Sequence, residues 1–442
     1  MHLHTKHRAK VGLAAAAAGA LALSACGGGD GSDGDGDGTN EDGQVELTLS
    51  VFGTMGYGPL VEEYNDMQDD VVVTMEGDGS EFNDDHLPMV DSAIEAGSGL
   101  GDVVGMDEQA ITQMMNNNDA WADLAEYGFD ERASDYPGWK WELGHTTDGK
   151  LAGFGTDVGG MGLCFRSDLF EEAGLTTDRE ELAELWSDWD GFKSVAQDFV
   201  DSGIDADFLD SPTQLQNMLL GQLAGTGDGD MYVDDEGNLT LDSAANTEAV
   251  ETILELNDMG AIGEYVSWSD EWNTAIAEGG FAVMACPSWM TGVISGTAGE
   301  DNAGNWDMAA APGVAGNWGG SWLLVPSQSQ HPEEAAELAS WLTEPEQQVK
   351  VFEDVGAFPS TLEGAEQVAD STNEYFNDAP VGQIIADSVA AMEPLVYSQY
   401  HHAVKGAVED VLNGVVDGTY TSDEAWDVMQ SEAENAIQLS GL

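Results

Sequence analysis

Carboxylates and tryptophans are the side chains of this sequence best suited to recognising a small molecule. The chain carries 84 aspartates and glutamates and 13 tryptophans in 442 residues. A carboxylate accepts hydrogen bonds at the edge of a polar ring, whereas an indole covers an apolar face. Two loops, at 53–58 and 106–108, follow stretches that are predicted to be strands. Ligands of open α/β sheets bind beyond the carboxyl ends of strands, so both loops are predicted to border a binding site.

No motif of a catalytic or metal centre stands out in the sequence. The Gly-x-Ser-x-Gly, His-Glu-x-x-His and Gly-x-x-x-x-Gly-Lys-Ser/Thr patterns are all missing. His401 and His402 are adjacent, so they diverge on a helix, and no third metal ligand accompanies them. We predict no metal and no cofactor. The prediction that the chain is not an enzyme comes from the N-terminal anchor, the tether and the family resemblance described below, and not from the missing motifs. A glycoside hydrolase needs two carboxylates beside the sugar, and among so many acids such pairs occur by chance. A secreted glycoside hydrolase therefore remains an alternative.

The charge balance excludes nucleic acid as a partner. The formal net charge is −73, with 11 basic residues against 84 acidic ones. Nucleic acids and anionic lipid surfaces both attract lysine and arginine, so neither suits this chain. The acids are spread along the chain, and salt screens their mutual repulsion. The composition is typical of a protein exposed to a salty medium.

The N-terminus predicts export and a lipid anchor. Lys6, Arg8 and Lys10 precede an apolar run at 11–23, which is too short to span a bilayer comfortably. The run ends in Leu23-Ser24-Ala25-Cys26, which resembles the bacterial lipobox. We predict a signal peptide over 1–25, a lipidated Cys26, and an acidic Gly/Asp tether over 26–44 that cannot pack.

Hydrophobic periodicity predicts an α/β fold. Strands are expected at 45–52, 71–75 and 102–105, and helices at 60–67, 87–96 and 108–116, an order typical of a parallel sheet. Further strands are expected at 162–165, 281–285, 306–310 and 322–326. Further helices are expected at 188–200, 213–223, 247–259, 270–278, 332–342, 399–412 and 422–437. With 42% hydrophobic residues, the chain can build a large core.

Two cysteines follow the predicted anchor. Cys164 and Cys286 each lie in a short apolar segment that is predicted to be a buried strand. Outside the cell two such thiols can form a disulfide, or they can remain free in the core.

Several segments resemble the extracellular solute-binding protein family one, whose members bind sugars. The matching stretches are Gly155-Thr156-Asp157, 162–175, 277–284 with Pro287-Ser288-Trp289, Gly319-Gly320-Ser321-Trp322, 331–343 and 356–360. Phe165-Arg166-Ser167 stands where the family usually has Tyr-Asn, and Ser288 replaces a glycine. The stretches 347–360 and 379–383 are similar to actinobacterial lipoproteins for cellobiose and xylobiose.

The resemblance implies a two-lobed, periplasmic-binding-protein-like fold of type II. Each lobe would hold a mainly parallel sheet flanked by helices, with the ligand in the cleft between the lobes. Lobe 1 would comprise 45–154 and 308–343, and lobe 2 would comprise 155–307 and 344–442. Hinge motion would close the lobes around the ligand.

Thirteen residues are predicted to bind the ligand. The polar and loop candidates are Thr54, Met55, Tyr57, Glu81, Asp107, Glu108, Asp157, Ser321 and Tyr400. The aromatic candidates are Trp268, Trp272, Trp289 and Trp322. The resemblance favours Asp107 and Asp157 as ligand contacts and Trp289 as a stacking ring. Each tryptophan could instead belong to the core, and most acids to the solvated surface.

The function implied by the resemblance is capture of a di- or oligosaccharide for an ABC-type importer. The protein would be a monomer held on the outer face of the cell membrane by lipidated Cys26. It would deliver the sugar to permease subunits that are powered by a separate ATPase. A non-sugar solute, such as a polyamine or a peptide, remains an alternative ligand.

Overall fold

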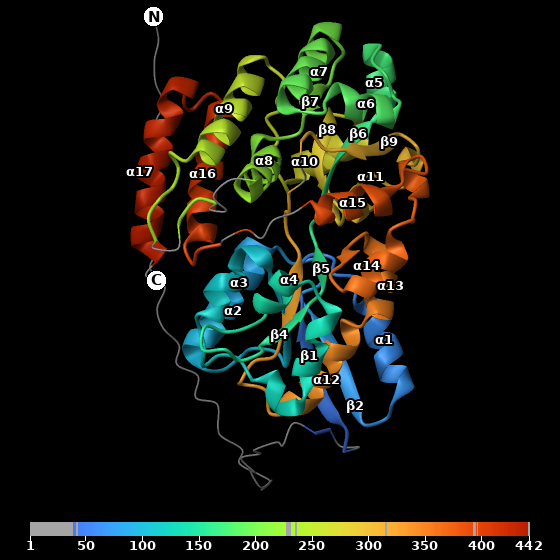
Figure 1. The fold of residues 1–442 in the computed structure, drawn as a ribbon, viewed down its shortest axis with the longest axis vertical. Helices are drawn as coiled ribbons and strands as arrows, with labels where there is room; N and C mark the ends of the chain where they lie inside the picture. Colours follow the sequence, from blue (N-terminus) through green and yellow to red (C-terminus); the bar gives the residue numbers. More distant parts are fainter. Residues whose placement is uncertain are drawn as a thin grey trace, which may run out of the picture. The chain divides into compact units, whose positions relative to one another are not determined.

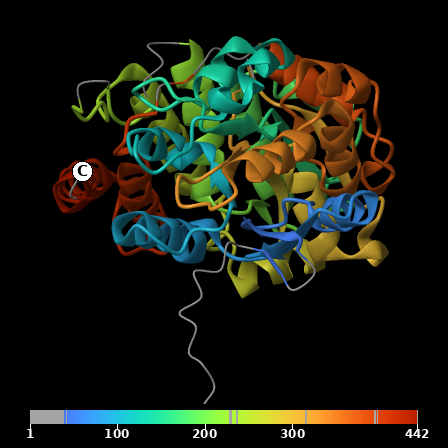
Figure 2. The same ribbon diagram turned by 90° about the horizontal axis from the view of Figure 1, so that it is seen from below.

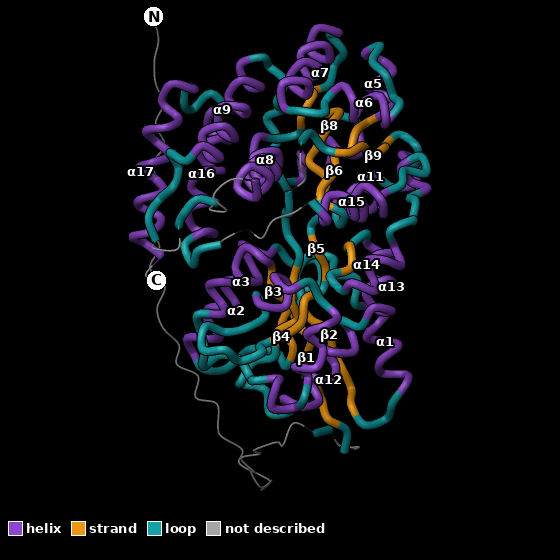
Figure 3. The backbone as a smooth tube through the Cα atoms, viewed as in Figure 1, coloured by secondary structure: helices purple, strands orange, loops and turns teal. Residues whose placement is uncertain are grey.

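Two β-sheets organise the chain in the computed structural model, which describes residues 39–40, 43–226, 231–234, 237–313, 316–391, 395 and 397–440 (Figure 1). The first sheet has the order β2-β1-β3-β10-β4 and the second has the order β7-β8-β6-β9. The strands are β1 (Val45–Ser50), β2 (Val71–Glu76), β3 (Val103–Asp107), β4 (Gly153–Gly155), β5 (Asp157–Val158), β6 (Met161–Arg166), β7 (Asp207–Leu209), β8 (Phe281–Pro287), β9 (Trp306–Ala310), β10 (Ser321–Leu324) and β11 (Phe358–Pro359). Figure 3 shows the strands in two groups, with β5 between them.

Helices pack around both sheets, and the α/β class is confirmed. They are α1 (Gly58–Met67), α2 (Leu87–Ala96), α3 (Glu108–Met115), α4 (Gly138–Glu142), α5 (Ser167–Ala173), α6 (Arg179–Leu185), α7 (Trp189–Ser202), α8 (Pro212–Thr226), α9 (Ala244–Asp258), α10 (Asp270–Glu278), α11 (Met290–Ala298), α12 (Pro332–Leu342), α13 (Pro345–Val355), α14 (Leu362–Val368), α15 (Val381–Ala390), α16 (His401–Val416) and α17 (Ser422–Ser440). Helices α1 to α4 and α12 accompany the first sheet, whereas α5 to α11 and α15 to α17 accompany the second.

The centre of the first sheet is buried on both faces. Along β3, Val103 faces one hydrophobic cluster and Val104 faces another. Along β10, Leu323 faces the same cluster as Val103, and Trp322 faces the same cluster as Val104. Successive side chains of a strand point to opposite faces, so a sheet covered on both sides needs continuous apolar strands. This burial explains why these strands show no polar alternation.

The strands of each sheet run mainly in one direction. In the first sheet β1 pairs in parallel with β2 and β3, but β10 is antiparallel to its neighbours β3 and β4. In the second sheet β7 and β8 are parallel, whereas β6 runs antiparallel to β8 and β9. Each sheet is therefore mainly parallel with one reversed strand, β10 in the first and β6 in the second. In the second sheet, β6 carries the chain away from the junction between the sheets and β9 brings it back.

A disulfide joins two neighbouring strands of the second sheet. Cys164 on β6 and Cys286 on β8 form the bond, and both residues are fully buried. The two cysteines are 122 residues apart in sequence. The bond therefore links two strands that are neighbours in the sheet but far apart in the sequence.

The predicted signal peptide, Cys26 and most of the tether lie outside the described residues. At the end of the tether, the amide of Gln44 donates to Asn40 Oδ1 at 3.0 Å, and Thr39 pairs with Val45. The last residues of the predicted tether thus pack against the start of β1 instead of remaining unstructured. Among the described residues, no helix combines the length and apolar character required to cross a membrane.

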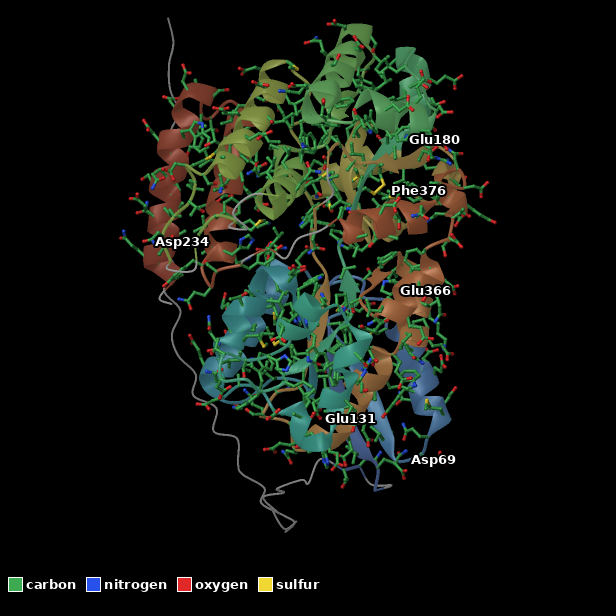
Figure 4. All side chains as sticks on the ribbon, in the orientation of Figure 1. Asp69, Glu131, Glu180, Asp234, Glu366 and Phe376 are labelled. Atoms are coloured by element: carbon green, nitrogen blue, oxygen red, sulfur yellow. A yellow bond between two sulfur atoms is a disulfide. The ribbon has the colours of Figure 1, made fainter. Side chains whose placement is uncertain are left out.

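The surface is strongly acidic. Figure 4 labels Asp69, Glu131, Glu180 and Glu366, whose side chains are exposed, whereas Phe376 is buried in the core. These four carboxylates come from four different segments of the chain. Exposed acids therefore occur on several separate parts of the surface.

Candidate functional site

A cavity of about 720 Å³ opens among loops and helices of both lobes. Its size falls within the range of roughly 300–1,000 Å³ that is typical of small-molecule sites. Nine of the thirteen predicted residues line it, namely Thr54, Met55, Tyr57, Glu81, Asp107, Asp157, Trp268, Trp289 and Ser321. The fold thus gathers segments that are as distant in sequence as 54–57 and 268–321.

Two carboxylates form the polar floor of the cavity. Asp107 is the last residue of β3 and caps α3, because its Oδ1 accepts from the amide of Gln109 at 2.9 Å. Asp157 lies on β5, and its Oδ1 accepts from the Thr156 hydroxyl at 2.6 Å and from the amide of Ser321 at 2.9 Å. Both carboxylates are held in place by the backbone. They are therefore positioned to accept hydrogen bonds from a ligand without large rearrangement.

A buried lysine lies beneath this floor. Lys140 of α4 is fully buried, and its Nζ lies 3.3 Å from the centre of the Trp322 ring. Its ammonium has no hydrogen-bond partner among the described residues. Burial lowers the pKa of Lys140 to about 8, and the nearby carboxylates Glu108, Asp157 and Asp107 oppose this shift. Lys140 supplies the positive charge that partly balances these three acids.

The buried carboxylates near Lys140 hold their protons more tightly than usual. Burial raises the pKa of Asp107 to about 6 and that of Glu108 to about 8. For Asp107 the charge of Asp157 adds to this effect, and for Glu108 the charge of Lys140 opposes it. A ligand hydroxyl that donates to Asp107 would favour its charged form.

Three tryptophans form an aromatic wall. The Trp289 ring lies 6.0 Å from the Trp268 ring with 24° between their planes, and 5.4 Å from the Trp318 ring at 71°. Trp289 Nε1 donates to the carbonyl of Trp318 at 3.3 Å. All three residues line the cavity. The rings therefore offer apolar faces beside the carboxylates of the floor.

Trp268 has a backbone conformation that is rare for a large residue. Its φ angle is +72°, and 42% of the residue is exposed. A bulky residue in the left-handed region is a genuine outlier, and such strain is often retained at binding sites. Ser267 fixes the preceding turn, because its hydroxyl lies 3.0 Å from that of Ser211.

Four predicted residues lie outside the cavity lining. Glu108 is buried and accepts from Asn317 Nδ2. Trp272 is fully buried, and its Nε1 donates to Asp210 at 2.8 Å. Trp322 is buried in the first sheet, and the half-buried Tyr400 lies beside Gly237. Trp272 and Trp322 are core residues, because α10 and β10 direct their rings away from the cavity.

Sequence reasoning missed part of the lining. Trp318 was not predicted, because it lies in the loop before β10 and no motif separates it from a core tryptophan. Gly320, with a φ of +101°, allows β10 to begin close to Asp157, because a Cβ there would lie 2.8 Å from the Asp157 carbonyl. Residues of α8 and α16 also line the cavity, and no sequence motif marked them.

Asp210 provides a test of pH dependence, away from the cavity. It follows β7 and is fully buried, and burial raises its pKa from an ordinary 3.8 to about 7. Between these two values the folded protein holds a proton that the unfolded chain releases, so stability falls as the pH rises. Asp210→Asn is expected to flatten the decline of the urea midpoint between pH 4 and pH 7.

The control for this test is Asp66→Asn, which removes an exposed carboxylate of α1. We expect this variant to keep the pH profile of the unaltered protein. A profile that is equally steep in Asp210→Asn and in the unaltered protein would show that Asp210 is ionised in the folded state near pH 5.

The described residues contain no group of three or more histidines, cysteines or acids arranged to hold a metal ion. Burial lowers the pKa of His401 and His402, which favours their neutral forms. His401 packs its ring 4.8 Å from that of Tyr397. His401 therefore contributes to the packing of α16.

The sequence matches the model of the family described as bacterial extracellular solute-binding protein over residues 59–379. It is 25% identical over 305 residues to the lactose-binding protein of Rhizobium radiobacter, covering 66% of this chain and 69% of the relative. It is 22% identical over 369 residues to an arabinooligosaccharide-binding protein of Halalkalibacterium halodurans, covering 78% and 79%.

Solved structures share the fold. A crystal structure of an extracellular solute-binding protein family 1 member superposes with a TM-score of 0.77 at 35% identity, covering 89% of this chain and 99% of that one. The galacto-N-biose/lacto-N-biose I-binding protein of Bifidobacterium longum superposes with a TM-score of 0.74 at 18% identity, covering 91% and 99%. The arrangement of the two lobes is thus the one found in these proteins.

Proposed function

Because the chain belongs to the bacterial extracellular solute-binding proteins, we propose that it captures a neutral di- or oligosaccharide and delivers it to an ABC-type permease. The observation that carries this proposal is the composition of the cavity described above. Trp268, Trp289 and Trp318 supply rings, and Asp107 and Asp157 supply acceptors beside them. A sugar ring presents C–H groups on its faces and hydroxyls at its edge, so it needs both kinds of partner.

The charge of the lining favours a neutral ligand. Six carboxylates line the cavity, namely Glu81, Asp107, Asp157, Asp354, Glu409 and Asp410. Among the described lining residues Lys405 is the one lysine, and no arginine accompanies it. Bringing another carboxylate into this cavity would cost free energy through repulsion and desolvation. A uronic acid therefore fits poorly, whereas an uncharged sugar fits well.

Thermal unfolding against a panel of ligands tests the proposal. The panel contains cellobiose, xylobiose, maltose, lactose, the glucuronide analogue of each available sugar, and spermidine, all in molar salt. At a hundred times its dissociation constant, a ligand stabilises the protein by about 2.7 kcal/mol. We expect at least one neutral disaccharide to raise the melting temperature by several degrees, and its uronic acid analogue to leave it unchanged.

The same acidic lining supports a second candidate ligand, a polyamine. A shift with spermidine but with none of the sugars would replace the sugar proposal by this one. Release of monosaccharide from a bound disaccharide over repeated turnovers would instead indicate a glycoside hydrolase. The relatives named above are binding proteins, which supports a protein that binds its ligand without chemical change.

Hinge motion between the lobes accompanies binding in our proposal. The chain passes between the sheets near β5, between β9 and β10, and near α13. Because β9 extends to Ala310, we place the second crossing between 310 and 321 rather than at 307. β5 pairs with β11 between the two sheets, which supports a hinge position for both strands.

Export and anchoring complete the proposal. The basic and apolar leader, Cys26 and the acidic tether support a protein that is attached by lipid to the outer face of the cell membrane, where we propose that it acts as a monomer. Mass spectrometry of the native protein tests this part: an acylated N-terminal Cys26 is the expected product, and an unmodified mature terminus would contradict it.

A further inference from the structure

The side-chain amide of Gln214 is buried in the wall of the cavity. The residue lies on α8, lines the cavity and is 1% exposed. Neither its Oε1 nor its Nε2 makes a hydrogen bond within the described part of the chain. Native interiors pair nearly all buried donors and acceptors, because an unpaired one lowers stability. The amide therefore marks a place in the cavity where a ligand can supply both partners.

Helix α16 covers α8 beside this amide. The two helices pack on each other, and α16 also contacts α3 of the first lobe. Asn217 of α8 donates from its Nδ2 to Glu409 Oε1 of α16 at 2.9 Å. Figure 2 shows the C-terminal helices in red beside the blue helices of the first lobe. Because α8 is covered in this way, the cavity is the place where a partner for Gln214 can enter.

A cluster of hydroxyls places Trp268 beside Gln214. Ser267 Oγ lies 3.1 Å from Thr213 Oγ1 and 3.0 Å from Ser211 Oγ. These contacts join the loop before α10 to the segment that leads into α8. Trp268 and Gln214 each follow a member of the cluster by one residue, and both line the cavity. An indole ring and an unpaired amide are therefore neighbours on the cavity wall.

The core supports this pair of neighbours through Trp272 and Asp210. The ring of the buried Trp272 lies 5.1 Å from that of Trp268, and its Nε1 donates to Asp210 Oδ2 at 2.8 Å. Ser211 Oγ donates to the same carboxylate oxygen at 3.3 Å. A strained backbone such as that of Trp268 persists only where its surroundings hold it. The hydroxyl cluster and the buried carboxylate thus fix the indole relative to Gln214 before a ligand arrives.

We propose that Trp268 and Gln214 hold one sugar ring together, and that Gln214 recognises a pair of adjacent hydroxyls on that ring. The indole covers an apolar face of the ring, and the amide offers one acceptor and one donor at its edge. One hydroxyl donates to Oε1, and its neighbour accepts from Nε2. The inference rests on the proposed function and deepens it. It requires that the ring on Trp268 carry two neighbouring hydroxyls that are free of glycosidic links.

Calorimetric titration with deoxy sugars tests this recognition. The probes are the disaccharide found by the thermal panel and its monodeoxy derivatives, each of which lacks one ring hydroxyl. Two derivatives, for neighbouring positions of one ring, leave the amide unpaired, so we expect each to bind the unaltered protein about tenfold more weakly or worse. Gln214→Met keeps the length of the side chain without its donor and acceptor, and is expected to weaken binding of the disaccharide itself by about tenfold or more. In this variant the same two derivatives are expected to bind within about twofold of the disaccharide, because no amide remains to be left unpaired.

Three controls separate recognition from a structural role. Gln214→Met removes an unsatisfied amide, so the ligand-free variant is expected to melt at the same or a higher temperature than the unaltered protein. Gln216→Met is the matched control, because Gln216 is also buried on α8 but does not line the cavity, and it is expected to leave every affinity unchanged. The double variant Trp268→Ala/Gln214→Met is expected to lose less affinity than the product of the two single losses, because both side chains contact one ring.

Several results would overturn the assignment. Equal affinity for the disaccharide in Gln214→Met and in the unaltered protein removes Gln214 from recognition and leaves the proposed function intact. Deoxy derivatives that lose the same affinity in both proteins show that the amide contacts neither hydroxyl. Losses that multiply fully in the double variant place Gln214 on a different ring from Trp268. If the unaltered protein binds no sugar, the proposed function and the assignment fail together.

Discussion

Trp289→Ala is expected to weaken sugar binding by about 30-fold or more. The Trp289 ring occupies the middle of the aromatic wall, stacked on Trp268 and in edge contact with Trp318. Removal of a central, desolvated aromatic side chain typically costs about 2 kcal/mol or more, which is about 30-fold in affinity. The loss would be larger still if the two flanking rings move once their neighbour is gone. Calorimetric titration with the sugar found by the thermal panel measures the effect.

Two companion variants make this result interpretable. Trp289→Phe keeps an aromatic face and is expected to lose less affinity than Trp289→Ala. Trp341→Ala removes a tryptophan of α12 that packs 5.2 Å from Tyr64 and does not line the cavity. It is expected to lower stability and leave affinity unchanged. Equal affinities in Trp289→Ala and in the unaltered protein would mean that the sugar does not contact the aromatic wall.

Loss of the disulfide is expected to lower the free energy of unfolding by about 2–5 kcal/mol. The bond closes a loop between cysteines 122 residues apart, which restricts the unfolded chain strongly. It also holds β6 against β8 in the centre of the second sheet. Urea denaturation of the double variant Cys164→Ala/Cys286→Ala measures the loss.

A measurement of sugar affinity separates the loss of stability in the double cysteine variant from a role of the disulfide in binding. Neither cysteine lines the cavity, so the double variant is expected to bind the sugar as the unaltered protein does while it remains folded. Reduction of the unaltered protein by a thiol reagent should reproduce the loss of stability. A double variant as stable as the oxidised protein would indicate that the thiols are unpaired in the native state.

Elements with strong local signals were predicted almost to the residue. The predicted bounds of α10, α12 and β9 agree with those in the structure. Ser269 caps α10, Gly279 ends it with a φ of +78°, and Pro332 begins α12, so local chemistry sets these ends. Helix α11 was missed, because its glycines, serine and threonines have low helix propensity and the helix depends on tertiary packing.

The clearest part of the predicted site lies where the chain leaves a strand. Asp107 was identified because it ends a recognisable strand, and it does line the cavity. Gln214 and Lys405 lie in the middle of amphipathic helices, where nothing local separates a cavity face from a core face. Trp322 shows the same limit within a strand, since a shift of one residue sends a side chain to the other face. Lys140 could not be predicted, because burial of a lysine depends on neighbours distant in sequence.

The placement of β10 determines when the first sheet can be completed. Ser321–Leu324 lies between β3 and β4, although both of those strands precede it by more than 160 residues. Until this segment arrives, β3 has an unpaired edge and β4 lacks its partner, and an open edge invites aggregation. The second sheet is interposed in the chain and can form meanwhile. Such long-range closure slows folding, so maturation of the protein as a whole waits for the last third of the polypeptide.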